Sequence, residues 1–256
     1  MELATKNDFF INKPKKTLNL KEIIELNKKF SEERFHLMNH SLKIMNFAYQ
    51  NFEVSIASSF GLEDVVLIHL ATMIYPKPKV FFLDTGRLHP ETYQTVEKIQ
   101  KKYSIDLQIY FPDSHEVEKL VREKGFFSFY ESIDNRKECC FIRKVKPLQR
   151  ALQNLDGWIT GLRKNQGITR KNVMPFELDL DNGNILKINP LFNWGWECIK
   201  TFVKLYKIPY NPLHDKNYLS IGCEPCTRAV RPGEDIRAGR WWWESPEHKE
   251  CGLHKR

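Results

Sequence analysis

Residues 52–74 read FEVSIASSFGLEDVVLIHLATMI, and this stretch decides the fold. It begins with a short β-rich run (52–58) and passes through a polar turn, SSFGLED (58–64), into a long apolar segment with a helical pattern. The order strand, turn, helix is typical of an α/β protein. In an open α/β sheet, ligands bind beyond the carboxyl ends of the strands, which is where this turn is expected to lie.

The same alternation continues along the chain. Three further β-rich runs follow, and helical stretches separate them; the runs are 79–84, 105–111 and 157–162. Alternating strands and helices predict a largely parallel sheet with helices on both faces. The composition changes on either side of this region, so we expect three parts: a helical N-terminal segment (1–45), an α/β domain (46–210) and a loop-rich C-terminal tail (211–256).

Composition narrows the class of protein. The chain has 256 residues, 41% of them hydrophobic, so it can bury a core as one domain with a small appended module. It has no apolar run of about 18 residues, and its first residues lack the features of a secretory signal. We therefore expect a cytoplasmic protein with no membrane partner. The net charge of +8 fits anionic partners, from nucleic acids to small sulfates or phosphates, and does not choose among them.

The polar turn after the first expected strand is a candidate anion site. Ser58, Ser59 and Gly61 offer hydroxyls and unencumbered backbone N–H groups at a helix N-terminus, where the helix dipole favours an anion. The alternative is an ordinary N-cap turn. The turn lacks the lysine and the spacing of a Walker A loop.

A second polar turn follows the next expected strand, in LDTGRLHPETY (83–93). Asp84, Thr85 and Gly86 form it, and we expect it at the same edge of the sheet. Two such turns together predict a nucleotide cleft in the α/β domain. Asp84 alone can instead cap the following helix.

Four of the six cysteines form two tight pairs, Cys139 with Cys140 and Cys223 with Cys226. A reducing cytoplasm disfavours disulfides, so the pairs indicate metal or redox chemistry. Adjacent cysteines on a helix suit an inorganic cluster several ångströms across better than a single zinc ion, and we favour a [4Fe–4S] cluster. The alternative is that the first pair is buried in the core and CEPC is a redox dithiol.

The two remaining cysteines lie in different surroundings. Cys198, in WGWECIKTF, has a helical and aromatic context, and we expect it to be buried. Cys251 lies among His248, Lys249 and further basic residues, and nearby positive charge favours the reactive thiolate. It is either a nucleophile on the tail or an incidental surface cysteine.

Several motifs together resemble the assimilatory sulfonucleotide reductases, specifically the thioredoxin-dependent adenylyl-sulfate (APS) reductases that carry a cluster. The resemblance runs from about residue 50 to the C-terminus, through SSFGLEDVVL, LDTGRLHPETY, CCFIRKVKPLQRAL, WITGLRKNQGITR, NPLHDKNYLSIGCEPCTRAV, AGRWWWE and KECGLH. It implies an adenine-nucleotide α-hydrolase-like fold. It also implies a [4Fe–4S] cluster on the two cysteine pairs, with Cys251 as the nucleophile.

The same resemblance implies a reaction in sulfate assimilation and cysteine biosynthesis. Cys251 attacks the sulfur of adenylyl sulfate, AMP leaves, and thioredoxin or a glutaredoxin-like dithiol donor releases sulfite from the S-sulfocysteine. The substrate contacts that it implies come from TGLR, TR, RAGR and the lysine after the first cysteine pair: Lys144, Gly161, Arg163, Arg170, Arg237 and Arg240. The cluster is then electrostatic and structural, because thiols supply the electrons.

Other interpretations stay open at this point. A reductase of the 3′-phosphorylated nucleotide (PAPS) would share the mechanism, although Glu63 and Asp64 would repel an extra phosphate. An ATP-dependent tRNA-modifying enzyme of the same fold, or a zinc-bound nucleic-acid module, would explain the basic charge, but we expect no nucleic acid partner. An oligomer is possible. The chain departs from the family pattern at Gly167, where a serine is typical.

Overall fold

A six-stranded sheet lies at the centre of the computed structural model, which describes residues 16–31, 37–167, 170–245, 249 and 252–253. The strands are arranged in the order β3-β2-β1-β4-β6-β5, and all neighbours are parallel except β5 and β6. Their bounds are β1 Val54–Ser58, β2 Lys79–Leu83, β3 Asp106–Tyr110, β4 Gly157–Ile159, β5 Phe176–Asp179 and β6 Ile185–Ile188.

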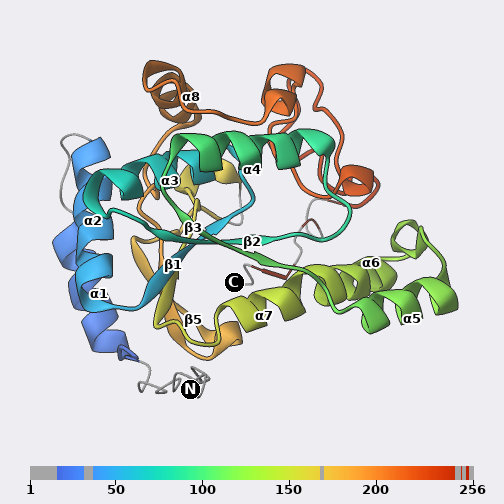
Figure 1. Ribbon diagram of the computed structural model, residues 1–256, viewed down its shortest axis with the longest axis horizontal. Coiled ribbons are helices and arrows are strands. Elements are labelled where there is room, and N and C mark those ends of the chain that lie inside the picture. Colours follow the sequence, from blue (N-terminus) through green and yellow to red (C-terminus); the bar gives the residue numbers. More distant parts are fainter. Residues whose placement is uncertain (1–15, 32–36, 168–169, 246–248, 250–251, 254–256) are drawn as a thin grey trace, which may run out of the picture.

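Helices cover both faces of this sheet. In Figure 1, α2, α3, α4 and α8 lie on one side and α5, α6 and α7 on the other. The expected α/β class with a largely parallel sheet is therefore confirmed. The helices are α1 Leu20–Ser31, α2 Leu37–Asn51, α3 Leu62–Ile74, α4 Pro90–Lys102, α5 Ser114–Lys124, α6 Ile133–Cys140, α7 Lys146–Ala151 and α8 Trp196–Leu205.

The stretch that predicted the fold forms its centre. β1 pairs with both β2 and β4, and α3 packs against β1, α2 and α8. A helix that is apolar all round belongs in a core, and most of α3, including Val65, Val66 and Leu67, is fully buried. The turn between β1 and α3 is thereby held at the carboxyl edge of the sheet.

Two strands were not predicted, β5 and β6, which form a hairpin through residues 180–184. Asn182 and Gly183 lie in this connection, and Gly183 has a left-handed backbone (φ 83). An Asn-Gly pair between short apolar runs is a hairpin signal, so this signal was present in the sequence. At the outer edge of the sheet, the Asn27 amide of α1 donates to Phe176 O (2.9 Å) and accepts from Phe176 N (3.0 Å), which covers part of an otherwise open strand.

The first cysteine pair ends α6, and a π-helical turn, η2 (Phe141–Val145), follows before α7. Pro147 lies in the first turn of α7. In a regular helix its ring would clash with the carbonyl four residues earlier, at Arg143. A widened turn before a proline relieves that clash, and such π turns are frequent at functional sites.

The segment after α8 has little regular structure, as expected for a loop-rich tail. It contains two short 3-10 helices, η6 (Pro212–Lys216) and η7 (Glu224–Cys226). An isolated bridge of Leu88 with Cys223 joins it to the rest of the fold, and a bridge of Thr227 with Arg240 lies within the segment itself. In Figure 1 this orange-to-red segment lies at the right of the view, near the end of α4 and above α5 and α6. The three-part division at residues 45 and 210 stays a prediction.

The apolar helices of this fold are short. Among the described residues, none combines the length and hydropathy needed to cross a membrane.

The close approach of β4 to β6 gives a first testable prediction. A Cβ on Gly157 would lie 2.6 Å from Leu186 O and 2.9 Å from Leu186 Cβ, which is closer than atoms in a packed core tolerate. We expect Gly157→Ala to lower the free energy of unfolding by about 1–3 kcal/mol, measured by urea denaturation. The control is Gly195→Ala, where the nearest atom is Cys198 Sγ at 3.9 Å. An equal effect of the two substitutions would contradict the prediction.

Candidate active site

A cavity of ≈ 230 Å³ opens beyond the carboxyl ends of β1 and β2. Its walls come from the two polar turns, from the helix that follows the first cysteine pair, and from the C-terminal segment. Nine of the predicted substrate-binding residues line it: Ser58, Ser59, Gly61, Thr85, Lys144, Gly161, Arg170, Arg237 and Arg240. Residues more than 180 positions apart in the sequence thus meet at one site.

Two predicted residues of the second turn do not line this cavity. The Asp84 carboxylate accepts from the Gly86 backbone N–H at 2.8 Å and from the Tyr93 hydroxyl at 2.9 Å. Gly86 has a left-handed backbone (φ 68), which glycine adopts without strain. The pair shapes the turn so that Thr85 between them lines the cavity.

The first polar turn is occupied in part by a carboxylate of the protein itself. Asp64 Oδ2 accepts from the Ser59 backbone N–H (2.6 Å) and from Ser59 Oγ (2.8 Å), and the Phe60 N–H donates to Ser58 Oγ (3.1 Å). Three donors of the expected anion site are therefore engaged within the chain. Phe60 is buried with a left-handed backbone (φ 57), which is costly for a bulky residue and is held by its packing on Phe82.

Burial makes the Asp64 carboxyl hard to ionise. It raises the pKa of Asp64 to about 6, although the hydrogen bonds from Ser59 act in the opposite direction. The neighbouring charge of Glu63 raises the pKa of Asp64 further.

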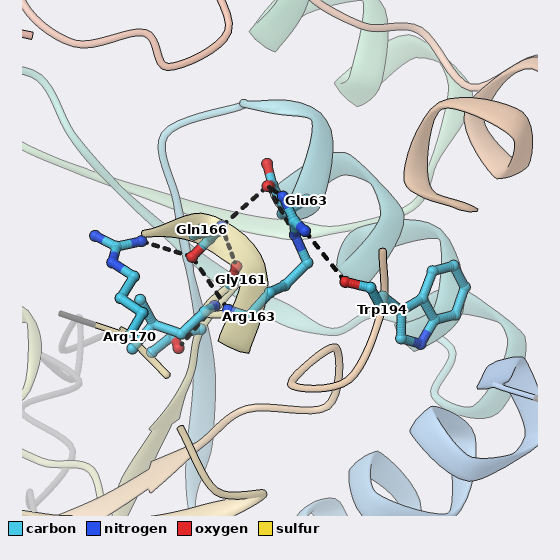
Figure 2. Close-up of polar contacts among 8 residues, drawn as sticks. Glu63, Gly161, Arg163, Gln166, Arg170 and Trp194 are labelled. Atoms are coloured by element: carbon cyan, nitrogen blue, oxygen red, sulfur yellow. Dashed lines mark hydrogen bonds and ion pairs between the residues drawn. The ribbon is translucent and has the colours of Figure 1, made fainter. Parts of the chain in front are cut away.

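Glu63 lies in a buried ion pair with Arg163 (Figure 2). Its Oε1 accepts from Arg163 Nε at 3.0 Å and from Arg163 Nη2 at 2.7 Å, while Arg163 Nη1 donates to Trp194 O at 3.1 Å. Burial acts to raise the pKa of Glu63, but the charge of Arg163 and the hydrogen bonds of its partners lower it overall. Arg163, predicted to contact substrate, is instead fully buried behind the cavity wall.

Gln166 connects this ion pair to Arg170, as Figure 2 shows, and itself lines the cavity. Its Nε2 donates to Glu63 Oε1 (2.9 Å) and to Gly161 O (3.0 Å). Its Oε1 accepts from the Arg163 backbone N–H (3.1 Å) and from Arg170 Nη1 (2.6 Å). All four hydrogen-bonding positions of the amide are used, so its orientation is fixed. Arg170 is thereby held on the cavity wall by a residue that the sequence did not identify.

The four paired cysteines converge on a second, smaller cavity. Cys139 and Cys140 reach it from the end of α6, and Cys223 and Cys226 from either end of η7. All four are free thiols, at most partly exposed. Within the described ranges no three His, Cys, Asp or Glu side chains are close enough to hold one metal ion. Four cysteines around a common space are a ligand set that an iron–sulfur cluster uses.

The electrostatics of these thiols also fit a bound cationic group. Burial raises the pKa of Cys226 to about 12, and the nearby Cys223 adds to this effect. Burial would likewise raise the pKa of Cys223, but Lys144, a hydrogen bond with Thr85 (Oγ1 to Sγ 3.2 Å) and Arg240 lower it overall. One thiolate is therefore favoured at the expense of its neighbour, and metal ions would be needed to deprotonate all four.

Lys144 and Arg240 line both cavities. They lie where cations can face the cysteine sulfurs on one side and an anionic ligand on the other. Arg143, one of the basic residues that follow the first cysteine pair, lines the cysteine cavity and donates to Thr85 O at 2.7 Å. The basic cluster after the first cysteine pair was visible in the sequence, but which of its members faces which cavity depends on the π turn.

Cys251, the predicted nucleophile, lies outside the described residues. Lys249 O accepts from Nη2 of the cavity-lining Arg237 at 2.9 Å, and Leu253 itself lines the larger cavity of ≈ 230 Å³. The chain on both sides of residue 251 is thus at the site.

Cys198 was expected to be buried, and this expectation is wrong. It is exposed, because the buried face of α8 is formed by Ile199, Phe202 and Val203. Of the three consecutive tryptophans, Trp241 is buried in the core and Trp242 is exposed.

This chain is similar to a known protein family and to several named proteins. Residues 53–229 match the family model described as "Phosphoadenosine phosphosulfate reductase domain". The chain is 46% identical to an "Adenosine 5'-phosphosulfate reductase" of Burkholderia cepacia, over 79% of this chain and 80% of that protein. It is 48% identical to "5'-adenylylsulfate reductase 3, chloroplastic" of Arabidopsis thaliana, over 88% of this chain and 51% of that protein. The chain therefore spans about half the length of the plant relatives that it matches.

Solved structures give the fold. A phosphoadenylyl-sulfate reductase from Candida auris superimposes with a TM-score of 0.70 at 29% identity, covering 85% of this chain and 100% of that one. An FMN adenylyltransferase from Candida glabrata has a TM-score of 0.53 at 14% identity, covering 92% of this chain and 83% of that one, a likeness of fold alone. The expected adenine-nucleotide α-hydrolase-like fold is confirmed.

The raised pKa of Asp64 predicts a pH-dependent stability. The folded-state pKa of about 6 lies above the ordinary value of about 3.9. Ionisation of the buried carboxyl therefore costs stability above pH 6, and the cost is relieved as the pH falls from 6 towards 4. A pKa difference of about two corresponds to about 2–3 kcal/mol. We expect the stability of Asp64→Asn relative to wild type to be about 2 kcal/mol more favourable at pH 8 than at pH 4.

The measurement is urea unfolding across this pH range, with the exposed Asp181→Asn as the control for loss of one charge. A stability difference for Asp64→Asn that does not change with pH would contradict the prediction.

Proposed function

Because the chain belongs to the phosphoadenosine phosphosulfate reductase domain family, we propose that it is an adenylyl-sulfate reductase, which converts adenylyl sulfate to sulfite and AMP in sulfate assimilation. The relatives named as adenosine 5'-phosphosulfate reductases support this assignment. The observation that carries it is the shared wall of the two cavities. Lys144 and Arg240 lie between the ≈ 230 Å³ cavity and four converging cysteines.

The cofactor of this proposal is a [4Fe–4S] cluster held by Cys139, Cys140, Cys223 and Cys226. The cluster together with its four thiolate ligands would carry net negative charge and would link α6 to η7, while the two reducing electrons come from thiols. Lys144 and Arg240 then separate like charges, because the thiolate ligands and the sulfate are both anionic. The buried thiols, the adjacent cations and the absence of disulfides among the described cysteines support this site.

Cys251 is the nucleophile in this proposal. Its thiolate attacks the sulfur of adenylyl sulfate, the bond from sulfur to the phosphate oxygen breaks, and AMP leaves with the electron pair. This forms an S-sulfocysteine. A thiolate of thioredoxin, or of a glutaredoxin-like dithiol donor, attacks the Cys251 sulfur and expels sulfite. The second thiol of the donor resolves the mixed disulfide and regenerates Cys251, so the dithiol is oxidised as the sulfate sulfur is reduced.

The cationic wall of the substrate cavity serves the first step. Negative charge grows on the phosphate of AMP as it leaves, and fixed cations stabilise it without reorganisation. Arg170, Arg237, Arg240 and Lys144 are available for this role. Arg163 contributes indirectly, through Glu63 and Gln166, by fixing Arg170.

The second candidate is the same reaction on PAPS. The similarity to a phosphoadenylyl-sulfate reductase structure favours it. Against it, the carboxylates of Glu63 and Asp64 line the cavity, and an ionised Glu63 would repel a 3′-phosphate. We therefore favour adenylyl sulfate. Measuring sulfite release from both nucleotides under the same conditions tests the choice of substrate. Faster release from PAPS would overturn it.

Location and assembly stay predictions. The plant relatives are named as chloroplastic, whereas the sequence of this chain led us to expect the cytoplasm. The thioredoxin-type donor and an oligomeric state likewise stay proposals.

The role of Cys251 is tested by labelling with adenylyl sulfate that carries radioactive sulfur. We expect wild type to take up label that a thiol releases as sulfite, while Cys251→Ser takes up none and keeps its iron and visible absorbance. Cys198→Ser, which removes an exposed cysteine, is the matched control and should label like wild type. Label that persists on Cys251→Ser would mean that another residue is the nucleophile.

A further inference from the structure

A buried ion pair joins the helix that bears the first cysteine pair to the C-terminal segment. Arg136 of α6 donates from Nε to Glu244 Oε1 at 2.9 Å and from Nη2 to Glu244 Oε2 at 2.7 Å. The exposed fractions of the two side chains are 0% and 3%. A bidentate contact with this geometry fixes the relative position of the two segments in two directions.

Arg136 also contacts the cysteine site. Its guanidinium hydrogen-bonds the Cys140 side chain, and it lines the cavity on which the four cysteines converge. One buried cation is therefore shared between a cysteine sulfur and the Glu244 carboxylate.

Trp241 extends this contact to the substrate cavity. Two guanidinium groups lie over its ring, with Arg136 at 4.8 Å and Arg240 at 4.5 Å from the ring centroid. Its backbone N–H donates to Cys226 O at 3.1 Å, and its own carbonyl accepts from the Glu244 N–H at 2.9 Å. Contacts thus run without a gap from two cysteines, through Arg136 and Trp241, to Arg240 on the substrate cavity wall.

This arrangement costs conformational free energy. Trp241 is buried with a left-handed backbone (φ 40), a conformation that costs about 1–3 kcal/mol for such a residue. A buried ion pair often contributes no more stability than apolar side chains of the same volume would, but removing one partner leaves an uncompensated charge. Stability alone does not require the pair, and its position suggests a role in the site.

We propose that Arg136 and Glu244 are positioning residues that couple loading of the cysteine site to placement of residues 241–245. When the cysteines are thiolate ligands, negative charge beside Arg136 holds this cation in place, and the cation holds Glu244. By reciprocity, a correctly placed segment stabilises the loaded site. The identity of the bound group rests on the proposed function, whereas the contact between the two segments does not.

The test compares Glu244→Gln with wild type, each with and without iron. Gln keeps the size of the side chain and removes its charge. The matched control is Glu234→Gln, which breaks the half-exposed pair of Arg228 and Glu234 in the same segment (2.8 Å). Hydrogen–deuterium exchange, resolved by mass spectrometry, follows peptides from 237–253, and peptides of β1 and β2 serve as the internal reference for global unfolding.

We expect iron removal to speed exchange in 237–253 about tenfold in wild type and in Glu234→Gln. In Glu244→Gln, exchange should already be about tenfold faster with iron bound, and iron removal should add little, because the coupled interaction is gone. Glu244→Gln should still bind iron, but it should lose iron to a chelator faster than wild type. If Glu244→Gln does not fold, Glu244→Asp keeps the charge with a shorter reach and should show a smaller effect in the same direction.

Two results would overturn the inference: exchange in Glu244→Gln that matches wild type, or an iron effect in Glu244→Gln as large as in wild type. Failure of the proposed function looks different. Wild type would then purify without iron or release no sulfite from adenylyl sulfate, while the comparison of Glu244→Gln with Glu234→Gln would still report on the ion pair.

Discussion

Four thiols lie around one small cavity, three of them buried, and ionising them all requires positive charge close by; much of the C-terminal half of the chain is organised around that constraint. Lys144 and Arg240 reach the cavity from two different segments, and Arg136 and Arg143 approach from the helix and the π turn. Three of these cations have a fixed partner: Arg143 donates to the Thr85 carbonyl, Arg240 lies over the Trp241 ring and Arg136 pairs with the Glu244 carboxylate. The cysteine site thus orders the surrounding loops, which have little regular structure of their own.

The substrate cavity follows the complementary principle, in which carboxylates order the cations. Glu63 binds Arg163 and, through Gln166, fixes Arg170 on the cavity wall. Asp64 occupies the donors of the first polar turn. Because these carboxylates begin α3, the most buried helix of the fold, their positions are set by core packing rather than by a surface loop. A site built in this way is preorganised, which is what electrostatic stabilisation of a leaving group requires.

The sequence predicted the parts of this arrangement that depend on local pattern. The strand, turn and helix of 52–74 were found because apolar periodicity and a polar turn coincide there, and the two polar turns meet at one cavity because parallel strands end at the same edge. The basic residues of that cavity came from the family resemblance and not from local pattern. Arg163 could not be placed, since whether an arginine faces a cavity or a buried glutamate depends on the tertiary partner. Cys198 was misplaced for a related reason: the aromatic residues around it pack on a different face of α8. The strands β5 and β6 are too short to be recognised from periodicity alone, and the Asn-Gly pair between them was not used as a hairpin signal.

The π-helical turn at Phe141–Val145 has a consequence for how this region tolerates change. An extra residue in one helical turn shifts the angular phase of everything that follows by about 100° relative to a regular α-helix. Cys139 and Cys140 precede the turn, while Leu148, which packs in the core, follows it. The wide turn therefore rotates the residues that follow it about the helix axis. As a result, the cysteine sulfurs face one cavity while Leu148 packs in the core. A single-residue deletion within the turn would leave the composition almost unchanged, and yet it would rotate Leu148 away from its present direction relative to the two cysteines.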